Sequence, residues 1–135
     1  MIPENVQTIE KEAFLGCKSL KTLNFSKAGN KLYTIGASAF SGLAITRVEI
    51  PSGVKIINSD AFKDCKNLYE VTFLGNNNQS LNISSGAFAG TKLLTIYNHR
   101  KSVNIYSNVF GSTASTNKIK KAAVDNDGDF KKYVK

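Results

Sequence analysis

Residues Ile50 to Phe73 read IPSGVKIINSDAFKDCKNLYEVTF, and this segment is one copy of a repeat that runs through most of the chain. An Ala-Phe pair lies near its centre, and an isoleucine precedes the alanine by four positions. A fixed spacing of this kind in every copy marks the chain as a repeat protein. The five copies, with valine replacing alanine in the last, are Ile9 with Ala13-Phe14, Ile35 with Ala39-Phe40, Ile57 with Ala61-Phe62, Ile83 with Ala87-Phe88 and Ile105 with Val109-Phe110.

Each of the first four copies is followed by a short run in which apolar residues stand two positions apart. Such alternation, rich in β-branched and aromatic residues, predicts a half-buried strand. The phenylalanines of the pairs lie 26, 22, 26 and 22 residues apart, so the full period is a double repeat of 48 residues. The runs are Leu23-Asn24-Phe25, Val48-Glu49-Ile50, Val71-Thr72-Phe73 and Ile96-Tyr97-Asn98, where Asn98 interrupts the alternation.

A repeat this short cannot bury its apolar positions alone, so the copies are expected to stack. Stacking would align phenylalanine on phenylalanine, isoleucine on isoleucine, and strand on strand in a parallel sheet. We therefore predict a solenoid of about five turns, α/β by class and rich in strand. Single helical turns are expected around the Ala-Phe pairs, opposite the strands, with Ser59 or Asp60 as an N-cap in the third copy.

The segment from Ile50 to Phe73 resembles the repeat of BspA-like leucine-rich repeat proteins, in which I-P-x-x-V-x-x-I-x-x-x-A-F-x-x-C-x-x-L-x-x-V-x-F recurs. The resemblance extends from residue 2 to about residue 110 and implies a leucine-rich-repeat solenoid. It also implies a cell-surface or secreted protein that adheres to protein or glycan ligands such as host matrix, because BspA-like proteins are associated with matrix binding and cell attachment. Such repeats occur in bacteria and in eukaryotic parasites, so the source stays open.

We expect the solenoid to occupy residues 1–110, and residues 111–135 to form a linker and a helical C-terminal cap. A free basic tail is the alternative for the last segment. Its apolar residues, which would close the core, are Ile119, Ala122, Ala123, Phe130, Tyr133 and Val134.

The opening segment, Ile2 to Ile9, matches Ile50 to Ile57 in phase, so the first turn has no cap before it. Because solenoid ends usually carry a polar cap, we expect an internal fragment of a longer array, with a natural short protein as the alternative. The uncapped N-terminal turn would favour edge-to-edge self-association.

Residues that could carry catalysis or bind metal are few and scattered. Cys17 and Cys65 occupy the same repeat position two turns apart, about 10 Å at the usual strand spacing. That distance exceeds the reach of a disulfide or of a shared metal, so two free, buried thiols are predicted. His99 is the only histidine, and no acid lies between Glu70 and Asp125 in sequence, which favours an exposed loop position. The sequence predicts a non-enzyme without catalytic residues, metal or cofactor.

The acids of Asp125-Asn126-Asp127-Gly128-Asp129 alternate as they do in a calcium loop. Phe130 stands where an EF-hand loop requires glycine, and the chain ends before the position of the bidentate glutamate. We expect a polar turn here and leave calcium binding open.

The formal net charge of +8 and the pI of about 9.5 raise the question of nucleic-acid binding. The side chains expected on the outer face of the strands include one base and two acids, which argues against specific recognition of nucleic acid. Basic residues lie instead in turns, in the tail, and in the links Lys27, Lys31, Lys55, Arg100 and Lys101. The predicted interaction face is one ladder of Thr22, Arg47, Glu70 and Thr95 and a second of Asn24, Glu49, Thr72 and Tyr97, with Arg47 and Glu70 paired across neighbouring strands.

The links Ser26 to Thr34 and Leu74 to Asn82 are long and polar, and are either binding loops or tolerated insertions. No stretch reaches the roughly 18 apolar residues that a transmembrane helix needs. We predict a non-enzymatic protein or glycan binding module. The alternatives are spacer repeats without a ligand and a weak, nonspecific binder of anionic polymers.

Overall fold

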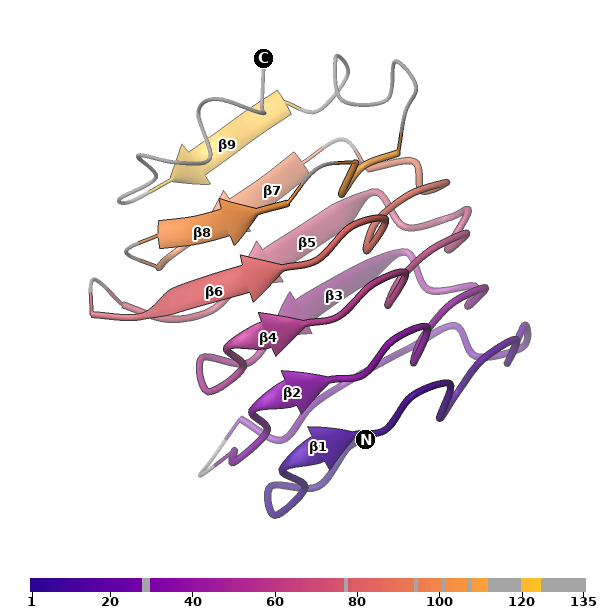
Figure 1. Cartoon of the computed structure of the whole chain (residues 1–135), viewed down its shortest axis with the longest axis horizontal. Helices are drawn as coiled ribbons and strands as arrows, with labels where there is room; N and C mark the ends of the chain where they lie inside the picture. The colour runs from indigo at the N-terminus through magenta and orange to yellow at the C-terminus, as the bar shows by residue number, and fades with distance from the viewer. Residues whose placement is uncertain are drawn as a thin grey trace.

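The computed structural model describes residues 1–27, 30–76, 78–93, 95–100, 102–106 and 108–111, and the backbone of 120–124. These residues form a parallel-strand solenoid of about four turns (Figure 1). The predicted stack of short parallel strands is therefore confirmed.

The strands form two parallel sheets on opposite sides of the core (Figure 1). The first sheet contains the constant isoleucines, and the second contains the alternating runs that the sequence predicted as strands. The first sheet is β1 (Thr8–Ile9), β2 (Thr34–Ile35), β4 (Ile56–Ile57), β6 (Ser80–Ile83) and β8 (Ser102–Ile105), and the second is β3 (Arg47–Ile50), β5 (Glu70–Phe73), β7 (Thr95–Asn98) and β9 (Lys120–Val124), each in that order.

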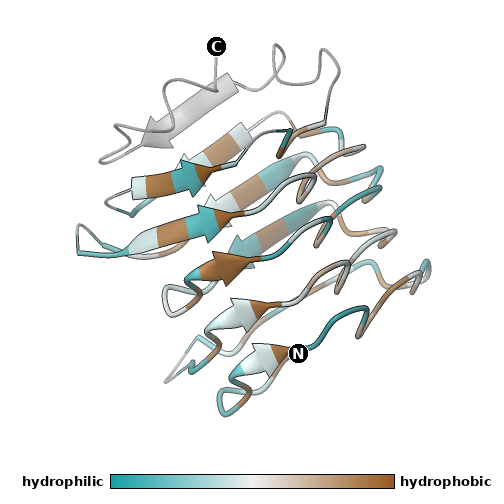
Figure 2. Ribbon diagram, in the orientation of Figure 1, coloured by the Kyte–Doolittle hydropathy of each residue, from teal (hydrophilic) through white to brown (hydrophobic). Residues whose placement is uncertain are grey.

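The strands of the first sheet differ in length because the spacing of their inward residues differs. In β4 and the residue pair before it, the buried residues Val54 and Ile57 stand three positions apart, which breaks the alternation and leaves a two-residue strand. In β6 the buried residues Leu81 and Ile83 stand two positions apart, and the strand extends over four residues. Figure 2 shows the resulting alternation of hydrophobic and hydrophilic bands along β6 and β8.

The phenylalanines of the Ala-Phe pairs form a ladder of stacked rings through the core. Ring centroids lie 5.4 Å apart from Phe14 to Phe40 and from Phe40 to Phe62, 5.2 Å apart from Phe62 to Phe88, and 6.3 Å apart from Phe88 to Phe110. Phe40, Phe62 and Phe88 are buried. The predicted stacking is confirmed, and offset aromatic stacking adds to the apolar burial in every turn.

The predicted single helical turns are wrong, since the described part of the chain contains no helix. Around the Ala-Phe pairs, backbone N–H groups donate to the next turn of the solenoid, as from Phe14 to Ala39 O at 2.8 Å and from Phe40 to Ala61 O at 2.8 Å. These bonds use the donors that a helix would direct back along its own axis. Asp60 is not an N-cap either, because its φ of 59° lies in the left-handed region.

The predicted helical C-terminal cap is also not supported. Residues Lys120–Val124 form β9, which pairs in parallel with β7 and shows a register shift between Ile96 and Asn98. The open edge of β7 offers unpaired backbone groups, and an added strand satisfies them. The calcium-loop candidate from Asp125 to Asp129 lies outside the described residues.

Both cysteines are free, as predicted, but only one is buried. Cys65 packs into the core, where its Sγ lies 3.1 Å from the carbonyl oxygen of Phe40 in the preceding turn, and burial raises the pKa of its thiol to about 11. Cys17 is exposed, so that part of the prediction is wrong.

Candidate interaction surface

The outer face of the second sheet carries most of the predicted interaction residues. Backbone pairing of β3 with β5 and of β5 with β7 places them in two straight ladders, in the predicted register. Arg47 and Glu49 are exposed, and the other members are half-buried. We call this set the charged face: Arg47, Glu70 and Thr95 in one ladder, and Glu49, Thr72 and Tyr97 in the other.

Thr22 and Asn24, the other two predicted residues, are exposed but do not continue these ladders. Among the described residues, their segment makes only an isolated bridge, from Phe25 to Ile2, and β3 pairs only with β5. One reason is that Pro51 has no N–H to donate to Phe25, whereas Leu74 N–H donates to Ile50 O at 3.0 Å in the next turn.

A groove of about 1150 Å³ lies at this interruption, between residues 23–27 and residues 47–52. The Nζ of Lys27 lies 3.6 Å from Oε2 of Glu49 and links the two sides. The predicted face is thus divided: six residues share one continuous sheet, while Thr22 and Asn24 lie across the groove.

Arg47 is held in place on the charged face by Tyr69. Its Nη2 donates to Tyr69 Oη at 2.8 Å, and its guanidinium carbon lies 5.9 Å from the centroid of that ring. Glu70 is its register partner, yet none of the ion pairs in the described part of the chain joins the two, so the predicted pairing is not formed as a salt bridge. The pKa of Arg47 is raised by the Tyr69 hydrogen bond and by nearby negative charge, including that of Glu70.

Arg100, which the sequence placed among the basic residues of the links, is completely buried. Its Nε donates to Leu74 O at 2.9 Å, and its terminal nitrogens donate to the carbonyl oxygens of Pro51, Val54 and Ser80. Burial lowers the pKa of Arg100 to about 10, so the side chain stays charged at neutral pH. Arg100 therefore ties three links together inside the molecule and is not part of a binding surface.

The residues beside Arg100 are structural as well. Asn98 is buried, and its side-chain oxygen accepts from the backbone N–H of Arg100 at 3.0 Å. His99 is half-buried rather than exposed, and its backbone N–H donates to Phe73 O at 3.0 Å. Within the described ranges, no three His, Cys, Asp or Glu residues gather as a metal would require, and no helix is long and apolar enough to cross a membrane.

The outer face of the first sheet was not identified from the sequence. On it, Asn104 Nδ2 donates to Asn82 Oδ1 at 2.8 Å, across β8 and β6. Two tyrosines are notably exposed, Tyr33 at 49% and Tyr106 at 59%. The available signal was the alternation of Leu81-Asn82-Ile83 and Val103-Asn104-Ile105 before the next Ala-Phe or Val-Phe pair, which predicts a second outward row.

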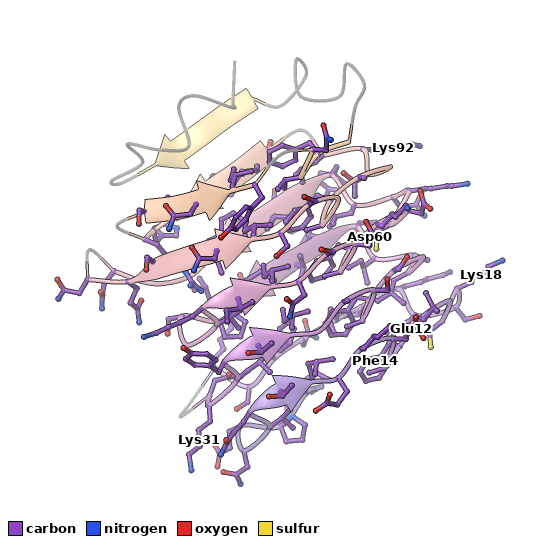
Figure 3. The ribbon with its side chains drawn as sticks, viewed as in Figure 1. Glu12, Phe14, Lys18, Lys31, Asp60 and Lys92 are labelled. Atoms are coloured by element: carbon purple, nitrogen blue, oxygen red, sulfur yellow. The ribbon has the colours of Figure 1, made fainter. Side chains whose placement is uncertain are left out.

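Basic side chains lie mainly at the edges of the solenoid. Figure 3 shows Lys18 and Lys92 projecting from the turn edge and Lys31 projecting from the opposite edge. All three are exposed. The predicted location of basic charge in turns and links holds for these three residues.

Comparisons with known proteins place these features in context. A family profile described as BspA type leucine rich repeat region matches residues 1–117, in six copies. Among solved structures, the pneumococcal vaccine antigen PcpA is similar, with 26% identity and a TM-score of 0.63 over 79% of this chain and 30% of that chain. A leucine-rich repeat protein from Bacteroides ovatus shows 17% identity and a TM-score of 0.49, over 93% of this chain and 48% of that one. Curated protein sequences give no match.

Proposed function

Because the chain belongs to the BspA-type leucine-rich repeat family, we propose that it is a non-enzymatic protein-binding module of a surface or secreted protein. The observation that carries the proposal is the charged face, where six polar side chains stand in register on a rigid sheet. The similarity to a pneumococcal vaccine antigen supports the surface or secreted location.

The geometry of the charged face suits a folded protein partner. Neighbouring ladder members stand about 4.8 Å apart, and the backbone of β5 is hydrogen-bonded on both sides, so little ordering is needed on binding. Arg47 is already held by Tyr69, which further lowers that cost. Arginine and tyrosine are also the residue types that most often dominate protein interfaces.

The mixed sign of the face argues against an anionic polymer as the ligand. Arg47 is the one base among the six residues of the charged face, and it is flanked by Glu49 in its own strand and by Glu70 in the next, so a polyanion would meet repulsion on both sides of it. A protein with complementary charges can satisfy both signs and gains specificity from doing so. We therefore take an adhesive partner such as an extracellular-matrix protein as the ligand class.

The experiment is surface plasmon resonance on immobilised fibronectin, fibrinogen and laminin. The protein should bind at least one of them, and Arg47→Glu with Tyr97→Ala should weaken that binding by about tenfold or more. The matched control, Lys18→Glu with Lys92→Glu, changes charge at the turn edge and should leave the affinity within about twofold at physiological salt.

Two results would contradict the proposal. Failure to bind any of the three proteins would favour spacer repeats without a ligand. Equal loss in the turn-edge control would show that net positive charge, rather than the charged face, drives attachment.

A further inference from the structure

We propose that the outer face of the first sheet, over β6 and β8, is a second binding site whose ligand is a neutral glycan. This site lies on the opposite side of the core from the charged face (Figure 1), and it shares no residue with that face. The inference therefore does not depend on the protein-binding function proposed above.

The centre of the site is an amide pair. Asn82 and Asn104 are register partners, both are exposed, and Asn104 Nδ2 donates to Asn82 Oδ1 at 2.8 Å. That bond orients both amides while using only one donor of Asn104 and one acceptor of Asn82. The amide donors of Asn82 and the amide oxygen of Asn104 are left to face solvent, so the pair offers both donors and an acceptor to a ligand.

Hydroxyl groups extend the site on both sides of the amides. Ser80 and Ser102 are register partners at the start of the two strands, and Ser84 follows β6. Sugar hydroxyls donate and accept at the same atom, which matches a surface of mixed amides and hydroxyls. The strands repeat about every 4.8 Å, close to the length of one hexose unit, so adjacent strands present equivalent groups to successive sugars.

An exposed aromatic residue follows the second strand of the amide pair. Tyr106 stands two positions after Asn104, on the same side of the extended chain, and its backbone N–H donates to Ile83 O at 3.1 Å. Its side chain is 59% exposed, although a tyrosine ring gains by covering its apolar faces. The C–H face of a pyranose would cover that ring while its hydroxyls reach the amides.

The absence of charge on these two strands points to a neutral ligand. Among the described residues of β6 and β8, every side chain is a serine, an asparagine or an aliphatic group. The exposed Lys55 lies directly before the neighbouring β4, with its Nζ 5.8 Å from the centroid of the Tyr33 ring. On β6 and β8 themselves a sulfated or acidic polymer would find no cation, and a protein partner would find none of the charge complementarity that the other face offers. A neutral glycan can bind without a cation on the surface and without charge complementarity.

The test is affinity electrophoresis in cathodic native gels that contain dextran, mannan or xyloglucan, with heparin as the charged comparison. We expect at least one of the three neutral polysaccharides to retard the protein. Tyr106→Ala, and Asn82→Ala with Asn104→Ala, should each lower the affinity by about tenfold or more, because stacking and hydrogen bonding are both needed. All three substituted residues are exposed, and thermal unfolding followed by circular dichroism verifies that each variant folds.

Tyr97→Ala is the matched control, because it removes a tyrosine from the charged face and should leave retardation unchanged. The proposal is overturned if no neutral polysaccharide retards the protein, if heparin alone does so, or if Tyr97→Ala reduces retardation as much as Tyr106→Ala. None of these outcomes bears on binding to matrix proteins, so the two proposals can fail separately.

Discussion

Arg100 shows how one side chain secures several turns at once. Its guanidinium lies in the core without a carboxylate partner among the described residues, and four backbone carbonyls accept its hydrogen bonds. Removing this side chain would leave its carbonyl acceptors buried and unsatisfied. The resulting loss of stability is larger than the net free energy that the hydrogen bonds contribute to folding. Arg100 therefore stabilises the side of the solenoid where the links between strands lie, even though burial disfavours its charged form.

Arg100→Ala is expected to lower the free energy of unfolding by about 3 kcal/mol, because it creates both a cavity and unsatisfied carbonyls. Urea denaturation measures this change. Lys31→Ala, in an exposed link, is the control and should change stability by less than about 0.5 kcal/mol. Equal effects of the two substitutions would refute the buried role of Arg100.

Cys65 makes the free energy of unfolding depend on pH in the alkaline range. Its ordinary pKa of 9.0 rises to about 11 in the fold, so the unfolded chain loses the thiol proton first. This contribution to the free energy of unfolding is fully present below pH 9.0 and is lost as the pH rises towards 11, by about 3 kcal/mol.

Urea unfolding at about pH 8 and about pH 10.5 tests this dependence on Cys65. Cys65→Ala should show a smaller drop in stability between the two than the unsubstituted protein. Cys17→Ala, at the exposed cysteine, should retain the full drop. A drop of the same size in all three proteins would rule out Cys65 as its source.

At the scale of the strand and turn, close backbone contact fixes residue identity. Gly36 follows β2, and a Cβ there would lie 2.6 Å from Ile9 O and 2.7 Å from Lys11 N, both of them backbone atoms that cannot move aside alone. Gly36→Ala should therefore destabilise the protein by about 1–3 kcal/mol in thermal or urea unfolding. Ser84→Ala, at the equivalent position of another turn, should have little effect, and an equally large loss there would contradict the steric explanation.

The elements that the sequence predicted well are those whose signal is local. The runs around Val48, Val71 and Ile96 alternate clearly, and they form the second sheet in the expected register. The Ala-Phe turns were wrongly predicted as helical. Their backbone N–H groups donate to the next turn, more than 20 residues ahead, and a local sequence pattern does not indicate such long-range bonds. Burial of Arg100 was missed for the same reason, since its acceptors lie 20 to 49 residues away.

The candidate sites, too, were predicted where the signal is local and missed where it is not. Six members of the charged face were predicted because alternate residues of one strand share a side. Thr22 and Asn24 were predicted to continue these ladders, but in the described structure their segment makes only an isolated bridge, and Pro51 has no N–H to donate to it. The amide pair of Asn82 and Asn104 was not identified, because the strand before each Ala-Phe pair was not distinguished from a link.

In the whole molecule, the two sheets separate two kinds of surface. The second sheet carries a mixture of charges, the first carries amides and hydroxyls over β6 and β8, and exposed lysines project from the edges (Figure 3). Among the described side chains, Lys18, Lys31 and Lys92 thus contribute their positive charge at the edges of the solenoid. Self-association at the N-terminal turn stays a prediction.

The affinity of the charge-swapped protein Arg47→Glu with Glu70→Arg for the matrix protein that it binds tests the central claim most directly. The swap keeps both charges on adjacent strands, so the free energy of unfolding should stay within about 0.5 kcal/mol of the original value. If the partner places an opposite charge against Arg47 and another against Glu70, the swap lowers the affinity by about tenfold or more. Binding at the original affinity would contradict recognition through the charged face.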